Sequence, residues 1–189
     1  MSEDILEAQR RGRTRFLGLD LEVAPGVLVP REETELLART VIARLSTVAR
    51  PVLVDVCCGS GNLACAIASN LPEARIWAAD LLPAAEALAR RNVASLGLSD
   101  RVQVFAGDLF APLLPILAEV GPLDAIVCNP PYISSGKLAE RTDLATEPAE
   151  AFDGGPYGLT IHQRVIREGL PLLRPEGRLF FEFGAGQAR

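Results

Sequence analysis

The stretch Asn129-Pro130-Pro131-Tyr132 carries groups suited to catalysis at a nitrogen atom. Its two prolines restrict the backbone, so the amide oxygen of Asn129 and the carbonyl oxygen of Pro130 can point into one cavity, beside the ring of Tyr132. A planar pair of acceptors can take both hydrogens of an amide or an aromatic amine and turn the nitrogen lone pair towards an electrophile. Such a site works by positioning and needs no strong base. An ordinary proline turn is the alternative interpretation.

A glycine turn occurs earlier, in Asp55-Val56-Cys57-Cys58-Gly59-Ser60-Gly61, between an apolar run and a helical pattern. Glycines let backbone amides approach a ligand, and a helix N-terminus favours a carboxylate or a phosphate. Together with Ala64, the glycines also fit a dinucleotide-binding turn, so an NAD-type domain has to be weighed against a nucleoside-binding one. A tight turn without any ligand is the third interpretation.

Two more carboxylates end the next two apolar runs. Asp80 follows Asp55 by 25 positions, at a place where a carboxylate can accept both hydroxyls of a ribose. Asp108, with Leu109 behind it, would lie within reach of an adenine edge. Each aspartate alone fits a loop or helix cap. Acidic residues at three successive strand ends together favour a nucleoside site.

These motifs need strands that end side by side. Apolar runs of strand length occur at 51–56, 75–80, 101–108, 123–130 and 177–183. Between them, apolar residues recur at helical spacing over 33–48, 61–70, 83–96 and 160–173. Runs without polar alternation are typical of parallel strands that helices cover on both faces. The sequence therefore predicts an α/β protein with a Rossmann-like, doubly wound, mostly parallel sheet, whose carboxyl edge carries the motifs.

Two segments depart from this alternation. Apolar and acidic residues alternate over 19–23, before a turn at 24–26 and a short apolar run at 27–29, which predicts an N-terminal β-hairpin beside the sheet. The segment 131–158 is too long for a plain connection in a compact domain, so we expect it to be a functional loop.

Composition excludes several functions. The chain has 189 residues, of which 49% are apolar and 23% charged, as expected for one globular domain. A net charge of −5 disfavours long duplex nucleic acid as a partner. The single histidine, His162, cannot form a multi-histidine metal site, and we expect no metal. We expect this histidine at the surface or at a helix cap.

Cysteine usage and the N-terminus indicate the cell compartment. The cysteines lie in apolar runs without the spacing of a zinc site. The N-terminus is charged where a signal peptide would be apolar, and no run is long enough to span a membrane. We therefore expect a reduced, cytoplasmic protein without a membrane segment.

The motifs, in their order along the chain, resemble those of class I S-adenosylmethionine-dependent methyltransferases that modify amino groups: DVCCGSG (55–61), AAD (78–80), GDLF (107–110) and NPPY (129–132). Three longer stretches are similar to the HemK-type protein-glutamine N-methyltransferases, which methylate the Gly-Gly-Gln glutamine of translation release factors: VLVPREETELL (27–37), NPPYIS (129–134) and EPAEAFDGGPYGL (147–159). The resemblance covers about residues 16–187. NPPY alone would also admit DNA-adenine and rRNA-guanine methyltransferases.

The resemblance implies a class I methyltransferase fold, S-adenosyl-L-methionine as cofactor, and roles for particular residues. It puts the glycine turn around the methionine part of the cofactor, Asp80 on the ribose, and Asp108 with Leu109 near the adenine. The cofactor-binding residues are then expected to be Asp55, Cys57, Cys58, Gly59, Ser60, Gly61, Asp80, Asp108, Leu109 and Asn129. The acceptor-binding residues are expected to be Asn129, Pro130, Pro131, Tyr132 and Tyr157, of which Asn129, Pro130 and Tyr132 would be catalytic.

Residues of the stretch 27–37 would flank the same pocket. By the resemblance these are Arg31, Thr34 and Glu35. Thr34 also fits a simpler interpretation as the N-cap of a helix.

Departures from the family pattern concern the cofactor turn and the acceptor. Glu32 replaces a proline, Tyr157 replaces an aspartate of the Asp-Gly-Gly loop, and Cys57 and Cys58 replace small residues before the glycines. The family's N-terminal helical domain, which holds the release factor, and its last helix and two strands have no counterpart in the sequence.

We therefore expect a basic N-terminal tail over 1–15 and a methyltransferase domain over 16–189 that lacks the last strands. The strand near 178–183 would then be open to a partner chain or to self-association.

Several functions are consistent with these features. The leading one, by resemblance, is methyl transfer to a glutamine side-chain amide in a protein. The alternative within enzymes is a biosynthetic reaction on a small-molecule amine, or on the amino-acid part of S-adenosylmethionine itself. An NAD-dependent oxidoreductase shares the glycine turn but leaves Asn129-Pro130-Pro131-Tyr132 unexplained. A non-catalytic cofactor-binding subunit is the last alternative.

Overall fold

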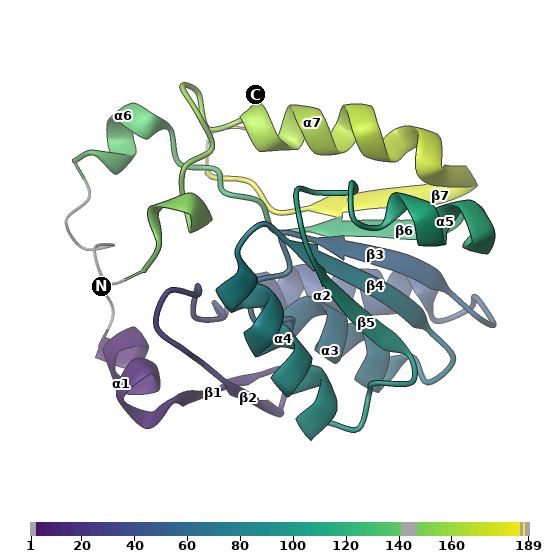
Figure 1. Ribbon diagram of the computed structural model, residues 1–189, viewed down its shortest axis with the longest axis horizontal. Helices are drawn as coiled ribbons and strands as arrows, with labels where there is room; N and C mark the ends of the chain where they lie inside the picture. Colours follow the sequence, from purple (N-terminus) through teal and green to yellow (C-terminus); the bar gives the residue numbers. More distant parts are fainter. Residues whose placement is uncertain (1–2, 141–146, 186, 188–189) are drawn as a thin grey trace.

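A five-stranded parallel sheet forms the centre of the computed structural model, which describes residues 3–140, 147–185 and 187 (Figure 1). The strand order is β5-β4-β3-β6-β7. The strands are β3 (Val52–Val56), β4 (Arg75–Asp80), β5 (Val102–Ala106), β6 (Leu123–Cys128) and β7 (Leu173–Phe181). The chain builds outwards from β3 to β5 and then returns to the other side of β3, so the order reverses between β3 and β6. The predicted Rossmann-like α/β fold is confirmed, and this reversal point is where such sheets bind ligands.

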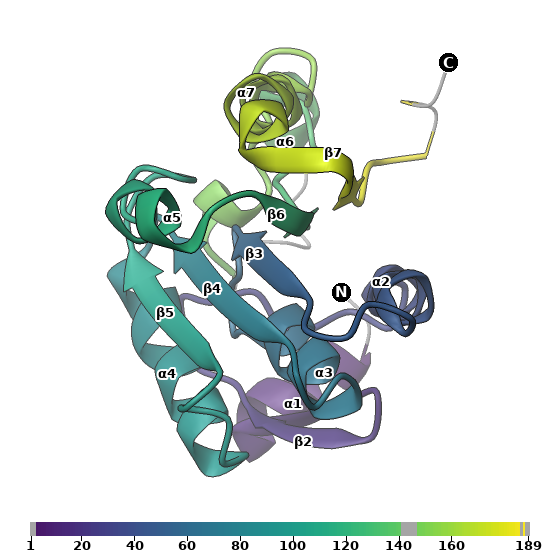
Figure 2. The same cartoon turned by 90° about the vertical axis from the view of Figure 1, so that its right-hand side faces the viewer.

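Helices cover both faces of the sheet (Figure 2). Leu53 and Ile76 point to one face, where they pack with α2 (Thr34–Leu45), α3 (Asn62–Asn70) and α4 (Pro83–Ser95). Val54 and Trp77, their neighbours in sequence, point to the other face, where they pack with α5 (Leu114–Val120) and α7 (Thr160–Gly169). Because the central strands β3 and β6 meet a helix layer on each face, they need apolar residues at successive positions.

The N-terminal segment contains the main difference from expectation. Helix α1 (Glu3–Arg11) is followed by an antiparallel hairpin of β1 (Arg13–Phe16) and β2 (Leu19–Glu22). The predicted pairing of 19–23 with 27–29 is wrong, because the turn lies at Leu17 and Gly18, both with positive φ. Most of the expected basic tail is therefore regular structure.

Further differences from expectation are elements that were not predicted and two shifted element boundaries. Helix α5 was not predicted, and two short helical turns, α6 (Ser135–Leu138) and η2 (Ala149–Ala151), lie in the expected functional loop. Helix α7 ends at Gly169, four residues early, since the following turn, η3 (Leu170–Leu172), contains a proline. Strand β7 starts at Leu173, before the predicted 177.

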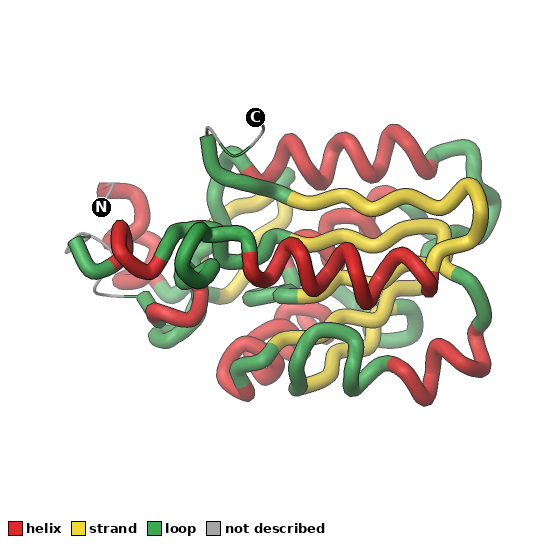
Figure 3. The backbone as a smooth tube through the Cα atoms, turned by 90° about the horizontal axis from the view of Figure 1, so that it is seen from above, coloured by secondary structure: helices red, strands yellow, loops and turns green. Residues whose placement is uncertain are grey.

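All five strands are parallel, so their carboxyl ends lie at the same side of the molecule; Figure 3 shows the strands side by side from above. The loops that follow them, the hairpin and the helical turns α6 and η2 gather there. No helix in the described part of the chain is both long and apolar enough to cross a membrane.

Candidate functional site

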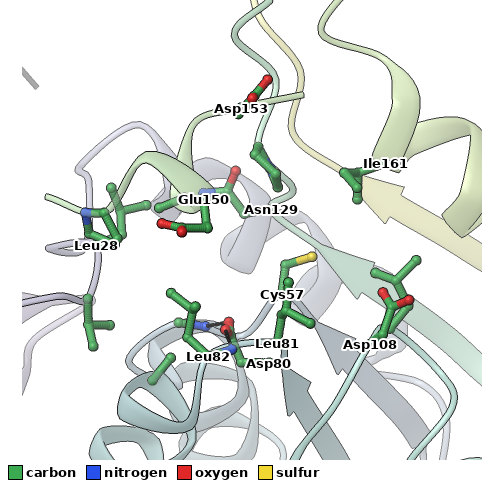
Figure 4. A pocket seen from close by; sticks show the side chains of 17 residues that line it. Leu28, Cys57, Asp80, Leu81, Leu82, Asp108, Asn129, Glu150, Asp153 and Ile161 are labelled. Atoms are coloured by element: carbon green, nitrogen blue, oxygen red, sulfur yellow. Dashed lines mark hydrogen bonds between the residues drawn. The ribbon is translucent and has the colours of Figure 1, made fainter. Parts of the chain in front are cut away.

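A cavity of about 300 Å³ opens at the carboxyl edge of the sheet, next to the reversal point between β3 and β6 (Figure 4). The loops after β3, β4, β5 and β6 all contribute to its wall. Seven residues that the sequence singled out line it: Cys57, Gly59, Asp80, Asp108, Leu109, Asn129 and Pro131. The fold therefore brings the separate motifs together in one space.

Left-handed backbone conformations shape the glycine turn. Cys57, Gly59 and Gly61 have φ of 58°, 55° and 76°. At Gly61 a Cβ atom would also come within 3.1 Å of the Cβ of Ala89 in α4, so glycine is needed there for both conformation and space. Cys57 adopts the same region at a conformational cost, at the point where the chain turns into the cavity.

Asp55 lies beneath this turn and not in the cavity wall. Its Oδ2 accepts the amide of Ala64 at 3.1 Å, and complete burial raises the pKa of its carboxyl to about 8. The Ala64 amide opposes this shift of the pKa, and the charge of Asp80 adds to it. The expected cofactor-binding role of Asp55 is therefore indirect, through the shape of the turn.

Asp80 faces the cavity and is held by backbone amides. Its Oδ2 accepts the amide of Gly59 at 2.8 Å, and its Oδ1 accepts the amide of Leu82 at 3.0 Å. Burial raises the pKa of this carboxyl, and the amides of Leu82, Gly59 and Leu81 oppose the shift. Each oxygen keeps a lone pair for a further donor, as two ribose hydroxyls would require.

Asp108 is paired with a residue that the sequence did not indicate. Arg164 of α7 binds it with both terminal nitrogens, at 3.0 Å and 2.8 Å. Its neighbour Leu109 is buried with a φ of 47° and lines the same wall. Arg164 also bonds Glu168 one turn along the helix. That local pair is visible in the sequence, whereas the contact with Asp108 depends on how α7 lies against the sheet.

Asn129 is held by residues from two distant parts of the chain. Its Nδ2 donates to Oγ1 of Thr34 at 3.2 Å, and that hydroxyl donates to Oε2 of Glu182 at 2.8 Å. The hydroxyl of Tyr132 donates to the other oxygen of Glu182 at 3.3 Å. The interpretation of Thr34 as an N-cap is wrong: its side chain is 1% exposed and engaged with this carboxylate. Glu182 was not predicted from the sequence.

The other expected acceptor residues differ in position. Pro131 lines the cavity, Pro130 is buried, and Tyr132 is partly buried against Glu182. Tyr157 is 85% exposed and is not among the residues that line the cavity. The structure therefore does not bring Tyr157 together with Asn129.

Backbone hydrogen bonds join the loop after β6 to the segment 147–158. The amide of Ile133 donates to the carbonyl of Phe152 at 2.9 Å, and the amide of Gly154 donates back to Ile133 at 2.8 Å. Nε2 of Gln187 bonds the carbonyl oxygens of Tyr132 at 3.0 Å and Gly158 at 3.2 Å. The segment thereby forms the outer wall of the cavity, to which Glu150 and Asp153 belong.

A smaller recess of about 30 Å³ continues the cavity beneath Leu28, Cys57 and Asn129. Arg31 and Thr34 line it, together with the buried residues Cys58 and Ser60 of the glycine turn. Glu35 does not line either space, because its carboxylate turns away to accept the amide of Leu17 at 2.7 Å.

Arg31 brings a positive charge to this recess. It forms an ion pair with Glu147, which also accepts the amide of Val29 at 2.8 Å. The Nη1 of Arg31 is buried and finds no hydrogen-bond partner within the described ranges. The positive charge of Arg31 suits a carboxylate placed in the recess.

His162 is buried and not at the surface as expected. Its side chain is 3% exposed, and its Nε2 lies 2.8 Å from the carbonyl oxygen of Glu182, to which it must donate. The ring packs edge-on against Phe181 at 5.2 Å. Residues 3–140, 147–185 and 187 contain no group of three or more His, Cys, Asp or Glu side chains that could hold a metal ion.

Residues 29–148 match the family model of the methyltransferase small domain. The chain belongs to this methyltransferase family. The membership confirms the methyltransferase class expected from the sequence and favours it over an NAD-dependent oxidoreductase.

Two similar proteins are both named release factor glutamine methyltransferase. The one from Moorella thermoacetica is 40% identical over 179 residues, which cover 94% of this chain and 62% of the relative. The one from Gloeobacter violaceus is 38% identical over 178 residues, which cover 93% of this chain and 60% of the relative. This chain thus spans only about 60% of the length of these relatives.

Solved structures agree in fold. A ribosomal protein L11 methylase from Lactobacillus delbrueckii subsp. bulgaricus has a TM-score of 0.60 at 22% identity, over 88% of this chain and 68% of that one. A methyltransferase complexed with SAH has a TM-score of 0.61 at 16% identity, over 90% of this chain and 41% of that one. At these identities the similarity shows the class I methyltransferase fold alone.

S-adenosyl-L-methionine is the cofactor that the family implies, and the chemistry of the cavity fits it. In the described part of the chain no cationic side chain pairs with Asp80, so its carboxylate suits the hydroxyls of a ribose, and the glycine turn leaves open space beside Gly59. Arg31, which lines the recess, has the positive charge that suits the carboxylate of the methionine part.

Proposed function

We propose that this chain transfers a methyl group to a glutamine side-chain amide of a protein, with a translation release factor as the leading substrate. The observation that carries the proposal is the position of Asn129: it lines the cavity while its amide nitrogen is engaged by Thr34. Its amide oxygen is then left for the hydrogens of an acceptor nitrogen. The names and 38–40% identity of the bacterial relatives support the substrate class.

In this proposal the chain acts by binding and orientation. When bound, S-adenosylmethionine supplies an electrophilic methyl group. Asp80 accepts the ribose hydroxyls, and Arg31 holds the methionine carboxylate. The amide oxygen of Asn129 and the carbonyl oxygen of Pro130 accept the two hydrogens of the glutamine amide, which directs the nitrogen lone pair at the methyl group. The nitrogen would gain the methyl group as the bond between that group and the sulfonium sulfur breaks, S-adenosylhomocysteine would leave, and the nitrogen would lose one proton to water.

The exposed ring of Tyr157 supports a protein acceptor over a small molecule. It lies on the segment that Gln187 ties to the loop after β6, and 85% of its surface faces solvent. An exposed aromatic side chain at the rim of a site suits contact with another protein surface. A ring meant for a small amine would be expected inside the cavity.

The test is mass spectrometry of a purified release factor, and of a peptide with its Gly-Gly-Gln loop, after incubation with the chain and S-adenosylmethionine. We expect one methyl group on the glutamine, and we expect none with Asn129→Ala. Because the chain spans about 60% of the relatives' length, the intact factor is expected to react slowly. Methylation of cofactor-derived or small-molecule amines alone would contradict the proposal.

Two expectations about partners and location accompany the proposal. In the described part of the chain β7 pairs with β6 alone, so a partner chain or a second copy on the residues near 178–183 stays a prediction, which light scattering at high protein concentration tests. A cytoplasmic location likewise stays a prediction.

A further inference from the structure

Glu182 lies immediately after β7 and is fixed from both sides. Its amide donates to the carbonyl oxygen of Cys128 at the end of β6, at 3.1 Å, and its own carbonyl oxygen accepts Nε2 of His162 from α7 at 2.8 Å. With the backbone anchored, the side chain is directed at Thr34 and Tyr132. The carboxylate therefore sits beside the acceptor site without lining either cavity space.

The chemistry of a carboxylate gives this contact a direction. An ionised carboxylate only accepts hydrogen bonds, so the single hydrogen of the Thr34 hydroxyl must point at Glu182. The Thr34 oxygen then faces Asn129 with a lone pair, and only the nitrogen end of the Asn129 amide can satisfy it. The chain of bonds runs one way, from Asn129 through Thr34 to Glu182.

This direction decides which end of the Asn129 amide faces the substrate. The oxygen and nitrogen ends of a primary amide are nearly equal in size, so packing alone does not distinguish the two orientations. A nitrogen turned to Thr34 leaves the oxygen for the cavity. In the reverse orientation two N–H donors would face the hydrogens of an acceptor amide.

We propose that Glu182 is a positioning residue that fixes the Asn129 amide with its oxygen towards the methyl acceptor, acting through the hydroxyl of Thr34. The inference rests on the proposed function in one respect: the acceptor nitrogen must present hydrogens to Asn129. Glu182 itself touches neither the cofactor site nor the acceptor.

Protonation of Glu182 removes the direction. A neutral carboxyl can donate to the Thr34 oxygen, and the Thr34 hydroxyl can then donate to the amide oxygen of a reversed Asn129. Burial raises the pKa of Glu182, and Glu33 raises it further, while bonds from Thr34 and Tyr132 lower it. The charged and titratable groups around it are Glu33 and Arg31 before α2, Tyr132 after β6, and His162 of α7. Activity should therefore fall on acidification as Glu182 gains its proton.

The kinetic test compares Glu182→Gln with Glu176→Gln, an exposed glutamate of β7 that serves as the matched control. We expect Glu182→Gln to lower kcat by about 10- to 100-fold while the affinity for S-adenosylhomocysteine stays unchanged, and Glu176→Gln to behave as wild type. The loss of kcat in Thr34→Val should match that in Glu182→Gln. The double variant should lose no more than either single variant, because both substitutions interrupt the same series of hydrogen bonds. Thr34→Ser should retain more activity than Thr34→Val. A wild-type kcat in Glu182→Gln would overturn the inference.

A second measurement needs no turnover. In the complex with S-adenosylhomocysteine, the ¹⁵N and ¹H resonances of the Asn129 side-chain amide should shift with pH in the wild type and not in Glu182→Gln. No such titration in the wild type would overturn the inference. The NMR measurement distinguishes failure of the proposed function from failure of this inference. If the wild type methylates no amide, the proposed function fails, but the resonances still report which way the Asn129 amide is held.

Discussion

The carboxyl edge has two halves that are held together in different ways: the proposed cofactor half around Asp80 and the proposed acceptor half around Asn129. In the cofactor half, Asp80 bonds the amides of Leu82, two residues away, and Gly59, 21 residues away. In the acceptor half, Asn129 bonds Thr34 across 95 residues, and Thr34 bonds Glu182 across 148. Backbone amides of neighbouring turns position one half, and side chains of distant segments position the other. The comparison indicates that the cofactor half is robust to side-chain replacement around it, while the acceptor half depends on each member of its network.

The strongest test of the comparison is Asn129→Ala. We expect turnover to fall by about 100-fold or more while cofactor affinity remains close to wild type, because the amide orients the acceptor. Single-turnover kinetics and calorimetric titration with S-adenosylhomocysteine measure the two separately. Equal losses in turnover and in cofactor affinity would contradict the division into two halves.

In the cofactor half, Asp80→Ala should weaken S-adenosylhomocysteine binding by about 1–3 kcal/mol, since a carboxylate accepting two hydroxyls forms charge-assisted hydrogen bonds. Glu86→Ala is the control, because Glu86 lies on the nearby α4, pairs with Arg90 and does not line the cavity. Calorimetric titration of both variants is the measurement. An unchanged affinity in Asp80→Ala would remove this residue from the site.

Asp55 gives a pH-dependent contrast within the cofactor half. Its pKa is raised to about 8, so the folded protein keeps a proton that the unfolded chain releases near pH 4. The stabilisation is complete below about pH 4 and is lost as pH rises through about 8. We expect the wild-type Tm to fall over this interval relative to Asp55→Asn, by about ten degrees or more. Parallel Tm curves for the two proteins would contradict the assignment.

The smallest effect is expected from the Arg164 and Asp108 pair at the rim of the cavity. Their side chains are 30% and 50% exposed, so Arg164→Gln should cost no more than about 1 kcal/mol of stability and should remove part of the salt dependence of cofactor binding. Arg167→Gln is the control, because Arg167 lies on the same helix and pairs with Glu168 and not with Asp108. A loss of stability much above about 1 kcal/mol would show that the rim depends on its side-chain network as strongly as the acceptor half does.

The sequence predicts the cofactor half well, for the reason that the comparison gives. Strand ends and glycine turns are local patterns, and a parallel sheet brings consecutive strand ends to one edge. The hairpin was mispaired because the Pro25-Gly26 turn is the stronger local signal, while the actual turn uses Leu17 with Gly18. The true partner strand, Arg13–Phe16, has two arginines among its four residues and buries only Phe16.

The acceptor half could be predicted only in part. Asn129 belongs to a recognisable motif, but Glu182 lies in an apolar run where nothing local marks a function. His162 was misplaced because a helical period shows that one face is buried and not which face. Both residues gain their roles from the packing of α7 and β7 against β6, which no short stretch of sequence encodes.

The buried side chain of Asn92 connects the hairpin with the glycine turn. Its Oδ1 accepts the amide of Glu22 at 2.7 Å, and its Nδ2 donates to the carbonyl oxygens of Glu22 at 3.1 Å and Ser60 at 2.9 Å. During synthesis the hairpin leaves the ribosome before α4, and the bonded residue of α4 follows 70 residues later, so these bonds cannot form until α4 has emerged. The contact between the hairpin and the glycine turn is thus completed only after α4 has emerged. Binding of the cofactor during translation would therefore show that Asn92 has formed its bonds with Glu22 and Ser60.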